Sequence, residues 1–327
     1  MPGMKPTSLA VSFVIGLALA LAASAEEKVI RIGIIGCDTS HVPAFTKEFN
    51  DPKASGDMAG FRVVAAFPGG SPDFELSISR VGGYRKTLEE EYGVKMMGSP
   101  AEVAGAADLL VLGSCDGRVH RKQFEETVGF HRPTFIDKPI ATSSADAKAI
   151  FDLAARENVP VMSCSALRYA ENLVKAIKEG EGPVVGVDVF GPMGEEKTQP
   201  GLFWYGIYCV EVIERVMGVG CKEVRATTNK EGDLISFVYG DGRMASMRGM
   251  RAGHHKFGAV IHREKGYQFV DISGGKRSYY AGMLDAIMAS LPMRRSDIKP
   301  EETMEVVGMI EAANESRGTG EMVKVRG

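Results

Sequence analysis

The sequence lacks several features that would assign it to a class at once. Its five cysteines are scattered without CxxC spacing, which leaves no pattern for a zinc site or a disulfide framework. A formal net charge of -3 argues against the basic surface that nucleic-acid binding requires. No internal repeat or low-complexity run is present. These absences indicate an ordinary globular protein of 327 residues with room for two domains and no nucleic-acid partner.

A metal-binding pattern is also missing. His254, His255 and His262 are close in sequence, but no carboxylate stands at ligand spacing beside them. A turn with solvated histidines accounts for them, and we predict no metal site.

Only one long apolar run occurs, at residues 9–22, after Lys5 and before the small residues Ala23, Ser24 and Ala25. This order is typical of a cleaved secretory signal. The run is shorter than the roughly 20 residues that a membrane span needs. We therefore expect residues 1–25 to be removed, leaving a periplasmic or extracellular protein with no membrane attachment. No twin arginine precedes the run, which favours export in an unfolded state.

The chain after this segment opens with a β-branched run, residues 28–36, that predicts a buried parallel strand. Residues 38–40 are good N-cap residues for a helix predicted over residues 42–49. A strand, a glycine turn and a helix start together form an anion site. The dinucleotide fingerprint G-x-G-x-x-G is only partly present, because Asp38 and His41 stand where its later glycines are expected.

The acidic residue that usually binds the cofactor ribose is absent as well. Residues 61–67 form the second predicted strand, and no acidic residue follows it before Asp73. Ribose recognition must therefore differ from the usual pattern, and the choice between NAD and NADP stays open.

Strands and helices continue to alternate, with a helix start at Ser99-Pro100 and strands at residues 108–113 and 135–141. This rhythm predicts a doubly wound parallel sheet, which binds ligands at the carboxyl ends of its strands. Lys138 stands at such an end. A lysine that is partly desolvated there has a lowered pKa suited to acid/base chemistry.

Beyond Tyr169 the strands follow one another without intervening helices. The strand candidates, joined by short glycine-containing turns, are residues 184–190, 221–229, 234–239, 243–250, 257–264 and 267–272. Two closing helices are predicted at residues 283–291 and 300–317. We expect an antiparallel sheet packed on helices.

Residues 136–141, Ile-Asp-Lys-Pro-Ile-Ala, follow a loop (residues 116–120) that ends in a histidine, and a later strand ends in Arg168-Tyr169. These motifs resemble the glucose-fructose oxidoreductase, inositol dehydrogenase and rhizopine catabolism (Gfo/Idh/MocA) family, whose hallmark is Glu-Lys-Pro at this strand end. Asp137 replaces the glutamate. The resemblance covers nearly all of the chain after the signal segment.

The resemblance implies an α/β protein with two domains. Residues 26–166 would form a Rossmann NAD(P)-binding domain, and residues 167–327 an α+β domain for substrate binding and oligomerisation with a mostly antiparallel open sheet. It also implies NAD or NADP as cofactor, a small carbohydrate or cyclitol as ligand, and a homo-oligomer.

One segment departs from the family. Family members usually carry Asp-x-Gly-x-His-x-x-Asp, with the histidine as general base. Aligned through Gly206, Trp204 stands at the first aspartate, Tyr208 at the histidine and Glu211 at the second aspartate. A tyrosine with a pKa of about 10 is a poor base at neutral pH, although a lysine cation nearby lowers a phenol's pKa. Alternatively, the two aromatic residues are stacking surfaces for a sugar ring or core residues.

Three groups of candidate site residues follow. The catalytic candidates are Lys138, Tyr208 and Glu211. The cofactor-binding candidates are Gly33, Gly36, Thr39, Ser40, His41, Ser114, His120 and Lys138. The substrate-binding candidates are Arg168, Trp204 and Tyr205.

Three functions remain open on these residues. The first is an exported NAD(P)-dependent oxidoreductase that acts on a sugar, cyclitol or glycoside by hydride transfer. The second is an NAD-assisted lyase or hydrolase that oxidises a sugar transiently so that its glycosidic bond can be eliminated. The third is a sugar-binding protein that has kept the cleft and lost redox chemistry.

Overall fold

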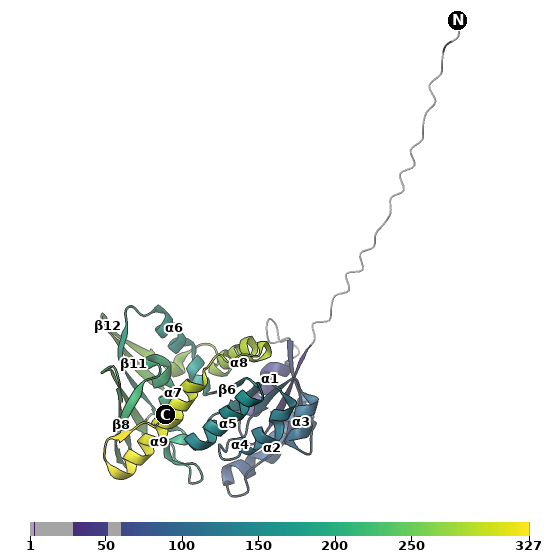
Figure 1. Cartoon of the computed structure of the whole chain (residues 1–327), viewed down its shortest axis with the longest axis horizontal. Coiled ribbons are helices and arrows are strands. Elements are labelled where there is room, and N and C mark those ends of the chain that lie inside the picture. The colour runs from purple at the N-terminus through teal and green to yellow at the C-terminus, as the bar shows by residue number, and fades with distance from the viewer. Residues whose placement is uncertain (1–2, 4–28, 52–59, 327) are drawn as a thin grey trace.

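The computed structural model describes residue 3, residues 29–51 and residues 60–326 (Figure 1). Apart from Gly3, the predicted signal segment lies outside these residues. Within them, no helix is long and apolar enough to cross a membrane.

The first half of the chain forms a parallel sheet. Its strands are β1 (Ile30–Ile35), β2 (Phe61–Phe67), β3 (Lys95–Met96), β4 (Leu109–Leu112), β5 (Thr134–Asp137) and β6 (Val161–Cys164). Over the described residues they lie in the order β3-β2-β1-β4-β5-β6, and every pairing is parallel. This is the strand order of a Rossmann domain. Its ligand crevice lies at the carboxyl ends of β1 and β4, where the strand order reverses. The predicted doubly wound sheet is confirmed.

Helices cover both faces of this sheet. They are α1 (His41–Asn50), α2 (Glu75–Tyr92), α3 (Pro100–Ala106), α4 (His120–Thr127) and α5 (Ser144–Arg156). Apolar residues of α3, α4 and α5 share one core with one sheet face, and those of α1 and α2 share the core on the other face. α3 begins as predicted, because the Ser99 side chain accepts a hydrogen bond from the Glu102 N–H and Pro100 occupies the first turn.

α2 is a long helix that contains two adjacent glycines. It starts at Glu75 and continues through Gly82 and Gly83, which weaken a helix in isolation. Burial of Leu88 and packing of Val81 against the α1 side of the sheet support this helix. Tertiary packing thus overrides the local preference.

The second half forms another sheet. Its strands are β7 (Val184–Pro192), β8 (Cys221–Asn229), β9 (Gly232–Tyr239), β10 (Met244–Met250), β11 (Gly258–Arg263), β12 (Gly266–Asp271) and β13 (Val323–Lys324). Over the described residues their order is β12-β11-β7-β10-β9-β8-β13. All pairs are antiparallel except β7 with β10. The predicted, mostly antiparallel sheet is confirmed.

Helices of the second half pack on one side of this sheet and also reach the first half. They are α6 (Glu171–Glu179), α7 (Gly206–Met217), α8 (Tyr279–Ser290) and α9 (Pro300–Thr319), with short 3-10 turns η3 (Ala166–Tyr169), η4 (Gly201–Phe203) and η6 (Leu291–Met293). α7 and α9 belong to the same core as the second sheet and α5. They therefore join the two halves.

α8 returns to the first sheet. Its residues Met283, Leu284 and Ile287 share a core with α1 and with β1 and β6, and Figure 1 shows the helix beside α1 and β6. The sequence predicts this helix as part of the second half, but its packing places it against the Rossmann sheet. It consequently brings residues from near the C-terminus close to the β1–α1 turn.

Candidate functional site

Lys138 lies at the carboxyl end of β5, under the second half of the chain. Its side-chain nitrogen Nζ is 4.4 Å from the ring centre of Tyr208 and 5.4 Å from that of Trp204. The residue is 8% exposed. Burial lowers the pKa of the Lys138 ammonium, and the neighbouring Asp137 carboxylate opposes part of that shift. Aromatic faces therefore replace water around this cation.

The β1–α1 turn is shaped for close contact with the β4 loop. Gly36 has φ +91, and a Cβ atom there would lie 2.1 Å from the Ser114 hydroxyl oxygen, so a side chain is excluded. The buried Asp38 points away from the helix start: its carboxylate accepts hydrogen bonds from the Ser77 hydroxyl (2.5 Å) and the Cys115 N–H (2.9 Å). These two hydrogen bonds hold the Asp38 carboxylate against the protein, so its negative charge does not face a ligand at the helix start.

Backbone donors at the start of α1 remain open. The N–H groups of Asp38, Thr39 and Ser40 have no hydrogen-bond partner anywhere in the described part of the chain. Ser40 precedes the helix and is exposed, but its side chain makes no capping bond. Successive free N–H groups at a helix N-terminus bind phosphate oxygens. This turn therefore fits the pyrophosphate of a dinucleotide despite the missing glycines.

His41 connects α1 to the end of β5. Its ring nitrogen Nδ1 lies 2.5 Å from Oδ2 of Asp137, and both residues are buried. The ring packs against Phe45 and Tyr280, with centroids 5.7 and 5.1 Å away. Burial would raise the pKa of Asp137, but the hydrogen bond with the neighbouring His41, together with Lys138, lowers it. Asp137 is thus held as a carboxylate against the imidazole.

A second buried carboxylate, Asp116, fastens three segments together. It accepts hydrogen bonds from Ser71 after β2 (2.6 Å), from Arg118 (2.7 Å) and from Gln199 of the β7–α7 segment (2.9 Å). Burial alone would raise the pKa of Asp116, but these hydrogen bonds lower it to about 2. Arg118 also pairs with Asp73 at 2.8 Å. The first acidic residue after β2 is therefore held in an ion pair.

His120 holds the segments after β4 and β5 together in this structure. One ring nitrogen lies 2.9 Å from the Pro139 carbonyl oxygen and the other 3.0 Å from that of Ser114. Burial lowers its pKa. The Ser114 hydroxyl accepts a bond from the Gln123 side chain at 2.8 Å. Both candidates thus lie at the predicted sheet edge, with their polar groups bound to the protein.

Tyr208 and Glu211 lie on α7 and are both buried. Burial, together with nearby acidic groups, raises the pKa of Tyr208 well above its ordinary value. The phenol therefore stays protonated at neutral pH. Glu211 accepts a hydrogen bond from the Ser165 N–H at 2.9 Å, and burial raises its pKa to about 8. Neither group is an effective base at neutral pH.

Arg168 is engaged on both arms. Its guanidinium pairs with Glu214 of α7 and Glu302 of α9, and the residue is 2% exposed. The sequence suggested a substrate anchor, but this geometry ties Arg168 to two helices. It acts as a cross-link between them.

Trp204 and Tyr205 form an aromatic row between the two halves. Trp204 contacts Phe74 of the first half edge-on at 5.5 Å, and Tyr205 contacts Tyr208 at 5.6 Å. Tyr205 also lines a cavity of about 560 Å³ with Phe257, Glu195 and Arg251. Aromatic faces combined with charged groups suit a polyhydroxylated ring.

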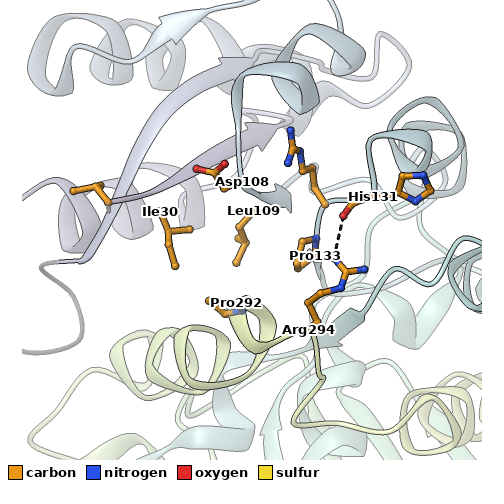
Figure 2. A pocket seen from close by; sticks show the side chains of 9 residues that line it. Ile30, Asp108, Leu109, His131, Pro133, Pro292 and Arg294 are labelled. Atoms are coloured by element: carbon orange, nitrogen blue, oxygen red, sulfur yellow. Dashed lines mark hydrogen bonds between the residues drawn. The ribbon is translucent and has the colours of Figure 1, made fainter. Parts of the chain in front are cut away.

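A different pocket, of about 270 Å³, opens at the opposite edge of the parallel sheet. Figure 2 shows Ile30, Leu109 and Pro133 at the amino ends of their strands, facing Pro292 and Arg294. Ligands of doubly wound sheets bind at the carboxyl ends instead. This pocket therefore does not belong to the crevice.

The remaining histidines form no metal centre. His262 pairs with Asp188 at 2.8 Å on the exposed side of the second sheet. No group of three residues able to hold a metal ion occurs in the described ranges. All five cysteines are buried and free.

The chain was compared with known proteins. No protein-family model and no curated protein matches it. Solved structures do match over about nine-tenths of its length. GenD2 from gentamicin A biosynthesis, in complex with NAD, has a TM-score of 0.74 at 16% identity, covering 92% of this chain and 97% of that one. The chain shares the fold of this NAD-bound structure.

Two further structures with this fold are inositol dehydrogenases. A putative myo-inositol dehydrogenase from Sinorhizobium meliloti 1021 has a TM-score of 0.74 at 15% identity, covering 91% of this chain and all of that one. The myo-inositol dehydrogenase from Lactobacillus casei, in complex with NAD(H) and myo-inositol, has a TM-score of 0.71 at 12% identity, covering 91% and 97%. The predicted family resemblance is thus confirmed at the level of the fold.

Sequence reasoning on this Gfo/Idh/MocA fold missed two contacts. The first is the His41–Asp137 pair, and the second is the bond from Gln199 to Asp116. The replacement of two fingerprint glycines by Asp38 and His41 is the sequence signal that could have directed attention to the first. No signal in the sequence marks Gln199.

Proposed function

We propose that this protein is an exported NAD(P)-dependent oxidoreductase of the Gfo/Idh/MocA family that acts on a sugar, a cyclitol or a glycoside. The observation that carries the proposal is the buried Lys138 against the rings of Trp204 and Tyr208, at the same sheet edge as the unpaired N–H groups before α1. The fold is shared with dehydrogenases crystallised with NAD and with myo-inositol. Export rests on the signal pattern of residues 1–25.

The dinucleotide would be held by Gly36 and by the backbone N–H groups of residues 38–40, and it would supply the hydride acceptor. Its adenosine ribose would meet the backbone of Gly69 and Gly70 after β2, because Asp73 is bound to Arg118. No unpaired carboxylate of the described residues would then repel the 2'-phosphate of NADP. We expect NADP to be tolerated alongside NAD.

The substrate would lie between Lys138 and the cavity beside Tyr205. Lys138 donates a hydrogen bond to the reacting oxygen, and its burial makes that bond strong. Tyr205 and Phe257 offer stacking faces, while Glu195, which also pairs with Arg251, can accept hydrogen bonds from hydroxyl groups. These residues orient the ring so that one carbon faces the nicotinamide.

The test begins with protein purified from the compartment to which it is exported. We expect dinucleotide to be released on denaturation, or a thermal shift when NAD or NADP is added. Lys138→Ala should retain the dinucleotide and lower turnover by roughly 10² to 10⁴-fold. If no dinucleotide is bound and neither cofactor shifts the melting temperature, redox function is excluded.

A second candidate, a sugar-binding protein without redox chemistry, is favoured by the closure of the crevice. Gln199 bonds to Asp116 and Trp204 packs on Phe74, so the β7–α7 segment is fastened to the first half. Sugar-induced thermal shifts in protein that binds neither NAD nor NADP would support this function.

We also propose a homo-oligomer that forms through the outer face of the second sheet. Large apolar side chains are exposed there: Val185, Leu234, Met244, Tyr267 and Phe269. Exposed apolar side chains gathered on one face of a sheet often mark an interface. Light scattering should give a multiple of the monomer mass, and the double variant Tyr267→Lys/Phe269→Lys should reduce it to the monomer.

A further inference from the structure

Oxidation of a secondary hydroxyl needs two acceptors. A hydride leaves carbon for the dinucleotide, and a proton leaves oxygen for a base on the protein. Tyr208 and Glu211 are less suited: both are buried and mainly protonated at neutral pH, and the Ser165 N–H already occupies one carboxylate oxygen of Glu211. His120 does not qualify either, since carbonyl oxygens occupy both of its ring nitrogens.

His41 differs from these residues because, in the described part of the chain, only one of its two ring nitrogens has a hydrogen-bond partner. The Asp137 carboxylate binds Nδ1, so Nδ1 carries the proton in the neutral imidazole. Nε2 is then the unprotonated acceptor, and it has no hydrogen-bond partner within the described ranges. Asp137, which carries this carboxylate, directly precedes Lys138 in the chain. His41 thus reaches from the phosphate-binding turn to the strand end that carries the lysine.

We propose that His41 is the catalytic residue that accepts the substrate proton and that Asp137 is its positioning residue. This inference rests on the proposed oxidoreductase function. In this reaction the O–H bond of the substrate would break and an Nε2–H bond would form on His41, while a bound dinucleotide would supply the acceptor for the hydride that leaves carbon. The substrate becomes a carbonyl compound and the imidazole an imidazolium, which Asp137 stabilises.

The charged and titratable groups around this imidazole come from two elements. Asp137 and Lys138 approach from the end of β5, and Tyr280 approaches from α8. The phenol of Tyr280 is kept neutral, because burial raises its pKa. The carboxylate of Asp137 is therefore the charged group in direct contact with the imidazole.

The first experiment reads the tautomer without a substrate. The protein is labelled with ¹⁵N-histidine, and its six histidines are observed by long-range ¹H–¹⁵N correlation. The signals lost in His41→Gln identify His41. We expect Nδ1 protonated and Nε2 unprotonated at neutral pH, and Asp137→Asn should shift the pattern. A His41 that is protonated on Nε2 throughout overturns the proposal.

The second experiment measures NAD reduction with myo-inositol, scyllo-inositol and glucose as probes. We expect His41→Gln to lower kcat by roughly 10² to 10³-fold, with the dinucleotide Kd within about threefold of wild type. The acidic limb of the kcat/KM profile should disappear in His41→Gln, because that limb reports protonation of His41. Asp137→Asn should move the limb to lower pH, a change that a purely structural role would not produce.

His262→Gln is the matched control, because His262 also pairs with an aspartate but lies outside the crevice. It should leave kcat and the pH profile unchanged. If the wild type turns over a probe and His41→Gln has a similar kcat, the role of His41 is overturned, whereas the oxidoreductase function is not. No wild-type turnover on any probe overturns the oxidoreductase function and the role of His41 together.

Discussion

Two histidine–aspartate pairs of similar length lie in opposite settings in this molecule. His41 and Asp137 are 2.5 Å apart at the crevice, with 10% and 4% of their side chains exposed. His262 and Asp188 are 2.8 Å apart on the second sheet, with 42% and 54% exposed. Water screens the second pair, whereas the first is held in a low-dielectric contact. The same two residue types thus form an oriented dyad in one place and a weak surface contact in the other.

The difference extends to other charges. Arg168, Asp38 and Asp116 are buried and paired with groups of the protein. Arg85–Glu89 on α2 is an exposed ion pair one helical turn apart. Burial makes a charge costly to leave unpaired, so buried charges specify geometry while exposed ones contribute little. Variants at matched positions can test this contrast.

The largest effect is expected at Arg168. Arg168→Ala leaves Glu214 and Glu302 without their cation, so the free energy of unfolding should fall by about 4 kcal/mol. Urea denaturation followed by circular dichroism measures the change. Arg85→Ala is the exposed control and should cost less than about 1 kcal/mol. Equal losses in the two variants would remove the contrast.

Asp137→Asn should have the next largest effect on stability. It removes a buried charge that faces both His41 and Lys138, and we expect a loss of about 3 kcal/mol in the free energy of unfolding. The measurement is urea denaturation at neutral pH. A loss below 1 kcal/mol would mean that water screens this pair after all.

Glu211 should make stability depend on pH. Its folded-state pKa of about 8 lies above the ordinary value of 4.5, so the folded protein binds the proton more tightly than the unfolded chain. Stability should therefore fall as pH rises from about 4.5 to 8, by about 1 kcal/mol per pH unit, and then level off. Glu211→Gln should remove that part of the slope in urea titrations at pH 6 and 8. An unchanged slope would contradict the assignment.

The smallest effect is expected at the exposed pair. Asp188→Asn should change the free energy of unfolding by less than about 1 kcal/mol, because solvent screens the bond to His262. High salt should leave the variant and the wild type equally stable. If Asp188→Asn lost as much free energy of unfolding as Asp137→Asn, the contribution of a histidine–aspartate pair would not depend on its burial.

Much of the fold was predictable because it depends on local patterns. The β-branched run before Gly36 and the apolar run before Lys138 became β1 and β5, and the consecutive strands after Tyr169 became the second sheet. The rule that parallel strands align their carboxyl ends placed Gly36, Ser114 and Lys138 at one edge.

The pairing of charges was not predictable. His41 and Asp137 are 96 residues apart, and Arg168 lies 134 residues from Glu302. Arg168 has the sequence features of a ligand anchor, yet two helices bring carboxylates to it. The return of α8 to the first sheet likewise depends on which apolar face finds a partner.

The sequence by itself determined the strand and helix periods, the parallel character of the first sheet and the position of Lys138, because hydrophobic spacing and turn residues act over a few positions. Only the tertiary structure decided which polar groups are buried together. Hydrogen bonds and ion pairs between distant segments have no local signature, and their strength depends on the burial that folding creates. The dyad of His41 and Asp137 exists for that reason.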